Sequence, residues 1–122
     1  MIKTIFVNGD YEFTLNFNDL IKSQKTIKII ETINSNEKCL KSFIANNPSL
    51  VIINFDTTVS DGLHLIRELL QMSKSLKILL ITTGLQISAI NQIHKFSNTV
   101  ILYKPFNLTM FNEKIQQIGL LE

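Results

Sequence analysis

Short apolar runs alternate with longer amphipathic stretches along this chain. The short runs are rich in β-branched residues and are mostly continuous, which is typical of strands covered on both faces of a sheet. The longer stretches repeat apolar residues every three or four positions, as one face of a helix does. The predicted strands are residues 2–7, 26–33, 50–53, 78–81 and 99–102, and the predicted helices are 13–23, 36–45, 62–72, 87–96 and 108–118.

These elements follow the order strand and helix, five times over, within 122 residues. Right-handed crossovers lay each helix back onto the sheet, so the order favours parallel strands with helices on both faces. No internal repeat and no linker rich in proline, glycine or serine divides the chain. We therefore expect a single doubly wound α/β domain over residues 1–122, with five parallel strands and five helices.

Composition narrows the class of protein. Hydrophobic residues make up 45% of the chain and charged residues 18%, which indicates a globular protein rather than a disordered one. The lone Cys39 lies on an apolar helical stripe and is expected in the core, and no signal-peptide pattern or long apolar segment occurs, so a cytoplasmic location and no membrane contact are expected. The lysines behind the net charge of +2 are scattered, which predicts no direct nucleic-acid partner for this segment.

Polar residues stand where three of the predicted strands end. Asn54 follows the third apolar run, Thr82 the fourth and Lys104 the fifth. In open parallel sheets this carboxyl edge is where ligands and chemistry collect. Seven residues after Asn54 comes Asp61-Gly62, which predicts a helix start with Asp61 as the N-cap. His64 and His94 have no partner at metal-ligand spacing and are expected on the surface.

The block from Pro48 to Gly62, the pair Thr82-Thr83 and the triplet Lys104-Pro105-Phe106 together resemble bacterial response-regulator receiver domains. In layout the chain is similar to the single-domain chemotaxis regulator. The resemblance implies a flavodoxin-like sheet of strand order 2-1-3-4-5 and a place in two-component signal transduction or a phosphorelay. Receivers take a phosphoryl group from a histidine kinase onto an aspartate at the end of the third strand.

In this chain Asn54 fills that phospho-acceptor position. A carboxamide oxygen is a far poorer nucleophile than a carboxylate and adds no charge to hold Mg²⁺. Asn54 is therefore not expected to accept a phosphoryl group. In place of the family's acidic pair after the first strand, the chain has Asn8-Gly9-Asp10, so that only Asp10 could supply a metal carboxylate, from the third place of the turn or from the second through a one-residue slip.

Other parts of the family's switch are retained or lost. By the resemblance, Thr82 matches the hydroxyl residue that moves toward the phosphoryl group, Lys104 matches the lysine that pairs with its oxygens, and Pro105 is a candidate cis-proline. The aromatic residue usual three places before the lysine is replaced by Ile101. A simpler interpretation is that Lys104 forms a structural ion pair with Asp56 or Asp10. Thr82 would then be present only because a β-branched residue suits a strand end and its hydroxyl forms local hydrogen bonds.

These observations favour a phosphorylation-independent receiver that is not an enzyme, has no cofactor and binds a protein partner or a second copy of itself. The expected surface comprises residues 87–96, 99–102 and 108–118. The first alternative is a working phospho-receiver that binds Mg²⁺ through Asp10 and Asp56 and uses Asp56 as a displaced acceptor. The second is a small-ligand-binding domain that uses the emptied pocket above Asn54. No glycine-rich phosphate loop, nucleophile elbow or Cys-x-x-Cys pair points to another chemistry.

Overall fold

A computed structural model describes residues 1–57, 62–96 and 98–119. Within these ranges five strands form one sheet: β1 (Ile2–Val7), β2 (Ile27–Ile33), β3 (Leu50–Asn54), β4 (Lys77–Thr82) and β5 (Thr99–Tyr103). The strand order is β2-β1-β3-β4-β5, and every neighbouring pair is parallel. The doubly wound α/β fold expected from the order of elements is therefore confirmed.

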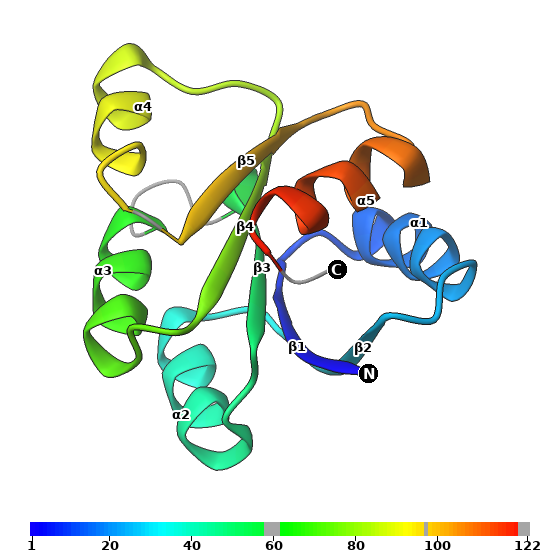
Figure 1. Ribbon diagram of the computed structural model, residues 1–122, viewed down its shortest axis with the longest axis horizontal. Coiled ribbons are helices and arrows are strands. Elements are labelled where there is room, and N and C mark those ends of the chain that lie inside the picture. The colour runs from blue at the N-terminus through cyan, green and yellow to red at the C-terminus, as the bar shows by residue number, and fades with distance from the viewer. Residues whose placement is uncertain (58–61, 97, 120–122) are drawn as a thin grey trace.

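Helices cover both faces of this sheet (Figure 1). The helical segments are α1 (Tyr11–Lys22), α2 (Asn36–Asn46), the 3-10 turn η1 (Phe55–Thr57), α3 (Gly62–Met72), α4 (Ile87–Ile93) and α5 (Leu108–Gln117). Buried residues of α1 and α5 pack on one face, and those of α2, α3 and α4 pack on the other. None of the helices in the described ranges is long and apolar enough to cross a bilayer.

Strand alternation divides the core between the two faces. In β3, Leu50 and Ile52 join the cluster under α1 and α5, while Val51 and Ile53 join the cluster under α2 and α3. All four side chains are fully buried, and each contributes about 1.5–3 kcal/mol relative to an exposed position. This two-sided burial is the reason that the strand runs are continuously apolar. Cys39 lies in the same core, as predicted.

Side-chain caps determine where several helices begin. The N-cap residues are Asp10 before α1, Ser35 before α2 and Asn107 before α5. In each, a side-chain oxygen accepts a hydrogen bond from the backbone N–H three positions later. Each cap satisfies one of the unpaired N–H groups of a first turn and stabilises the helix by about 1 kcal/mol. Asp10 therefore has a structural role at the start of α1. Asp61, predicted as a further N-cap, lies outside the described residues.

The apolar faces of α4 and α2 bury fewer residues than the sequence spacing predicts. The helix expected over residues 87–96 ends at Ile93, and Gln86 at its start makes no side-chain cap. Ile87 is 77% exposed and Ile44 on α2 is 71% exposed, although both have the helical spacing of buried residues such as Ile93 and Phe43. The reason is geometric, because each lies at the edge of a helical face that only its neighbours bury. Both remain as apolar side chains on the surface.

Candidate functional site

Three strand ends bring the predicted polar residues together at the carboxyl edge of the sheet. Asn54 is the last residue of β3 and pairs with Ile81 of β4. Thr82 is the last residue of β4, and its carbonyl accepts a 2.8 Å hydrogen bond from the backbone N–H of Lys104. Asn54 and Thr82 are fully buried, whereas the side chain of Lys104 is partly exposed. The peptide bond that links Lys104 to Pro105 is cis.

The carboxylate of Asp56, in η1, is the acceptor at the centre of this group. Its Oδ1 accepts a hydrogen bond of 2.7 Å from the Thr82 hydroxyl, and its Oδ2 accepts one of 3.0 Å from Lys104 Nζ. The backbone N–H of Thr83 donates to both oxygens, at 3.2 and 3.1 Å. A carboxylate offers about four lone-pair positions, so these contacts occupy its accepting capacity.

The same contacts decide the charge of Asp56. Burial by itself would raise the pKa of this carboxyl group. The hydrogen bonds from Thr82, from Lys104 and from the Thr83 backbone, together with the positive charge of Lys104, outweigh burial and lower the pKa below its ordinary value of 3.8. Asp56 is therefore ionised at neutral pH and forms an ion pair with Lys104, which is the structural pair that the sequence left open between Asp56 and Asp10.

Asn54 connects Lys104 to the end of β1. Lys104 Nζ donates to Asn54 Oδ1 at 2.9 Å, and Asn54 Nδ2 donates to Asn8 Oδ1 at 2.8 Å. Asn8 in turn donates from Nδ2 to the Asp10 carbonyl at 2.7 Å and to the Thr14 hydroxyl at 2.5 Å. A carboxamide suits this place because it accepts from a cation on one side and donates to an amide oxygen on the other.

The carboxyl groups of Asp10 and Asp56, the predicted metal ligands, make separate contacts in the described part of the chain. The side chain of Asp10 is exposed and accepts a 3.2 Å hydrogen bond from the backbone N–H of Phe13 as the cap of α1. It is the side chain of Asn8, rather than that of Asp10, that reaches Asn54. Among the described residues no group of three His, Cys, Asp or Glu side chains could hold a metal ion. Mg²⁺ requires carboxylate oxygens, and here the ammonium of Lys104 already contacts those of Asp56, so the residues present do not fit this ion.

Sequence reasoning missed Phe13 as part of the site. Lys104 Nζ lies 4.3 Å from the centroid of the Phe13 ring, a cation–π contact of about 0.5–2 kcal/mol. Phe13 also stacks on Phe17 at 5.8 Å between ring centroids. Its helical spacing predicted a core residue, and no local signal distinguishes a phenylalanine beneath a lysine from one in the core. Thr83 was also missed, because its contribution is a backbone N–H.

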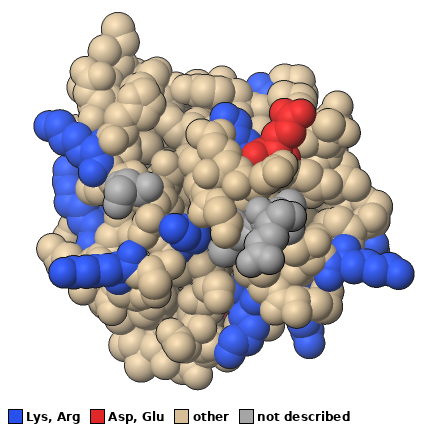
Figure 2. Space-filling model, viewed as in Figure 1, with Lys and Arg blue, Asp and Glu red and all other residues tan. Residues whose placement is uncertain are grey.

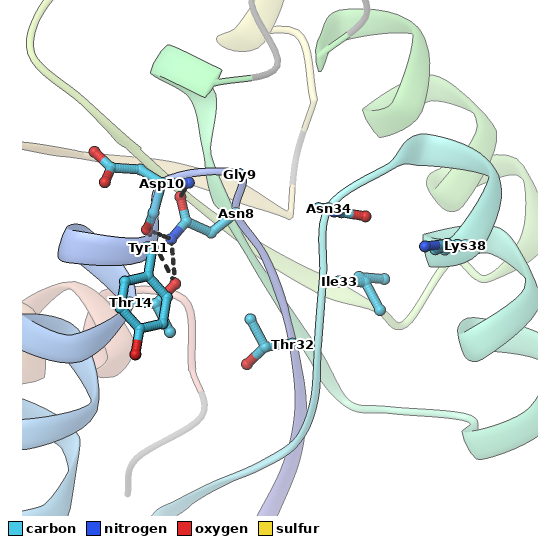
Figure 3. A pocket seen from close by; sticks show the side chains of 9 residues that line it. All are labelled: Asn8, Gly9, Asp10, Tyr11, Thr14, Thr32, Ile33, Asn34 and Lys38. Atoms are coloured by element: carbon cyan, nitrogen blue, oxygen red, sulfur yellow. Dashed lines mark hydrogen bonds between the residues drawn. The ribbon is translucent and has the colours of Figure 1, made fainter.

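A hollow of about 410 Å³ lies beside this group, at the carboxyl ends of β1 and β2. Figure 3 shows its walls, with Tyr11 and Thr14 from α1 on one side and Asn34 and Lys38 on the other. Asn54 is not among its lining residues, since the side chain is fully buried between Lys104 and Asn8. This hollow is therefore not the pocket expected directly above Asn54, which stays a prediction.

The strand order, the two helical layers and the polar group at the carboxyl edge define a doubly wound α/β domain of the flavodoxin-like type. The chain belongs to the family of response regulator receiver domains, whose pattern matches residues 5–116. It is thus a receiver domain of the kind used in signal transduction. A comparison with curated proteins finds no match.

Solved structures share this fold at low sequence identity. A LuxR-family two-component response regulator from Aurantimonas superimposes with a TM-score of 0.83 at 12% identity, over 97% of this chain and 84% of that one. The receiver domain of RcsB from Salmonella enterica, solved with the phosphomimetic BeF3-, gives 0.81 at 12% identity over 97% and 89%. The response regulatory domain of mrkE from Klebsiella pneumoniae gives 0.80 at 17% identity over 96% and 94%. At these identities the likeness shows the fold alone.

Proposed function

We propose that this receiver domain works without phosphorylation and signals by binding another protein. The observation that carries the proposal is the set of hydrogen bonds on Asp56. In the family, the residues that Thr82 and Lys104 match hold a phosphoryl group. In this chain both already donate to the Asp56 carboxylate, at 2.7 and 3.0 Å. A permanent carboxylate thus occupies the donors that a transient phosphoryl group would otherwise engage.

The chemistry at Asn54 supports the same conclusion. A phospho-acceptor must attack phosphorus with a negatively charged oxygen while a metal ion neutralises the developing charge. Asn54 has no carboxylate, and its carboxamide is held between Lys104 and Asn8. The loss of the acidic pair at Asn8 and Gly9 removes the expected metal ligands as well. The phosphoryl switch is degenerate at the acceptor position and at the metal site together.

Asp56 as a displaced acceptor is the competing function. Attack from Asp56 would first require its oxygens to give up hydrogen bonds from Thr82, Lys104 or Thr83. Each such bond to a charged group contributes about 1.5–3 kcal/mol. Within the described ranges Asp56 is not part of any group of three His, Cys, Asp or Glu side chains that could hold a metal ion. These costs favour a structural role for Asp56 over a catalytic one.

Incubation with acetyl phosphate and Mg²⁺ tests this function directly. We expect the intact mass of the protein to stay unchanged, while a receiver with an intact aspartate site, treated in parallel, gains one phosphoryl group. The opposite outcome is a phosphoryl mass on the wild-type chain that disappears in Asp56→Asn. That result would establish Asp56 as an acceptor and end the proposal.

The partner surface that we propose is the face formed by α4, β5 and α5. Three large apolar side chains are exposed there: Ile87 at 77%, Tyr103 at 44% and Met110 at 40%. Contiguous apolar patches are typical of interaction sites, and we propose that these three side chains contribute to one. A protein partner, or a second copy of the chain, would bury them and could favour one conformation of the domain without any phosphoryl group.

Substitution by arginine tests this surface. Ile87→Arg should abolish capture of the partner or self-association in light scattering, because it places a charge in an apolar contact. Ile44→Arg is the matched control, since Ile44 is as exposed but lies on α2 outside this face. Equal effects of the two substitutions would argue against the α4, β5 and α5 face.

A further inference from the structure

Charge is unevenly divided between the two ends of the sheet. We call the segments that precede the strands, residues 1–3, 22–28, 47–50, 73–78 and 94–99, the amino edge. The amino edge contains no Asp or Glu and seven lysines: Lys3, Lys22, Lys25, Lys28, Lys74, Lys77 and Lys95. The connections after the strands contain the acidic residues Asp10, Asp56 and Asp61 and one basic residue, Lys104. The positive charge of this nearly neutral chain is therefore concentrated at one end.

Strand register brings lysines of the amino edge close together. Lys3 of β1 stands opposite Lys28 of β2. Lys77 of β4 stands opposite Leu50 of β3, which itself stands opposite Thr4, the neighbour of Lys3. With strands about 4.8 Å apart, the row from β2 to β4 spans about 15 Å. Like charges directly opposite each other raise the energy of a sheet unless something anionic lies between or beside them.

Little within the chain neutralises this row. Among the described residues the only carboxylate within 4 Å of an amino-edge lysine is Asp19, which is 3.9 Å from Lys22 in a pair exposed to solvent. Lys3 and Lys77 donate to neutral oxygens, the carbonyl of Asn46 and the side chain of Asn98. On the face drawn in Figure 2, blue side chains lie at several places around the outline and near the middle, and the red atoms form one small group. The positive charge of these lysines can therefore attract an acidic partner.

A hollow with an apolar floor adjoins two of these lysines. It lies between α1 and β2 and measures about 660 Å³. Leu15, Ile27 and Ile29 contribute apolar lining. The charged lining residues are Lys22, Lys28 and Asp19, so that the lysines outnumber the carboxylate. The volume is large enough to admit aliphatic side chains, and Lys22 and Lys28 suit carboxylates next to them.

We propose that this hollow and the amino-edge lysines bind an acidic protein segment whose apolar side chains alternate with Asp or Glu. The positive charge of the lysines attracts carboxylates, and the apolar lining of the hollow accepts apolar side chains of the bound segment. Nucleic acid fits less well, because the amino edge has no arginine for bidentate phosphate contacts and the hollow has no aromatic lining on which a base could stack. A membrane fits less well, because it needs protruding rather than recessed apolar groups. The surface lies at the opposite end of the sheet from Asn54, so it does not depend on the function proposed above.

A fluorescent peptide of alternating Glu-Glu and Leu-Leu pairs serves as the probe. We expect its binding, followed by anisotropy, to weaken steeply as NaCl rises from about 0.1 M to about 1 M, where the screening length falls from about 10 to about 3 Å. In amide NMR spectra the peptide should shift residues 22–29. Reversal of two charges in Lys22→Glu/Lys28→Glu should lower the affinity about tenfold or more, because each change removes an attraction and adds a repulsion.

Lys38→Glu/Lys41→Glu is the matched control, since it reverses two exposed lysines on α2 and leaves the net charge equal to that of the test variant. We expect the control to retain the wild-type affinity. Equal losses in both variants, binding that salt does not change, or tighter binding of oligouridine RNA or of phosphatidylserine vesicles than of the peptide would each overturn the proposal.

Discussion

The hydroxyl of Thr82 donates a 2.7 Å hydrogen bond to the carboxylate of Asp56. The end of β4 is thereby joined to η1, 26 positions earlier in the sequence, and Lys104, directly after β5, completes the contact. The group is satisfied without a metal ion or a phosphoryl group. Thr82 and Lys104 both donate to the Asp56 carboxylate, and the following predictions test the consequences.

Removal of the Asp56 carboxylate should destabilise the fold. Asp56→Ala leaves Thr82 and Lys104 without their acceptor, and we expect the free energy of unfolding to fall by about 2–4 kcal/mol in urea titrations. Asp19→Ala is the control, because its pair with Lys22 is exposed and should contribute within about 0.5 kcal/mol. Similar losses in the two variants would show that the Asp56 contacts contribute little.

The stability contributed by Asp56 should depend on pH in a defined direction. Its pKa is lower in the folded protein than in the unfolded chain, where an aspartate titrates near about 3.9. The contribution is therefore complete above that value and is lost as the pH falls through the lower, folded-state pKa. Urea titrations between about pH 6 and about pH 2.5 should show the difference between wild type and Asp56→Asn shrinking in acid. A difference that stays constant or grows in acid would contradict the assignment.

Gly62 should not tolerate a side chain. A Cβ at this position would clash with the ring of Phe55, approaching Cδ2 to 2.8 Å, and Phe55 is buried. We expect Gly62→Ala to cost about 1–3 kcal/mol, and Phe55→Leu to recover part of it in a double-mutant cycle. Gly84→Ala is the control, since a Cβ there has no atom within 4 Å and should leave stability nearly unchanged.

The thiol of Cys39 should be inert in the folded protein. Burial, with a smaller effect from Glu31, raises its pKa to about 12, and the side chain is fully buried in the core. A thiol reagent such as DTNB should react only on unfolding, so the rate in buffer should follow the opening of the core and rise with urea. Rapid reaction in buffer would mean that the α2 side of the core opens readily.

Much of the fold could be predicted from the sequence, because each element carries its own local pattern. The strand runs 50–53 and 78–81 are apolar at every position because helices bury both of their faces, so that neighbouring residues such as Ile52 and Ile53 are both in the core. The exposure of residues at the edges of helical faces was harder to predict. Ile44 and Ile87 have the spacing of core residues, and only the packing of neighbouring elements reveals that they are exposed.

The site was predictable in membership but not in its connections. Asn54, Thr82 and Lys104 could be placed at one edge because parallel strands end together. The hydrogen bonds among these residues could not be predicted. They depend on which way a short turn directs Asp56 and on whether Asn8 or Asp10 faces inward. Phe13 beneath Lys104 had no sequence signal at all, because an aromatic residue on an apolar face has the same spacing in either role.

Amide NMR with Mg²⁺ and beryllofluoride, a phosphoryl mimic, tests the central claim most directly. The backbone N–H groups of Thr83 and Gly84 report on the site, because one donates to Asp56 and the other to the Thr82 hydroxyl. We predict that neither signal, nor that of Lys104, moves on addition of either reagent. Saturable shifts of these signals in the wild-type protein that vanish in Asp56→Asn would show a working phosphoryl site and contradict the account.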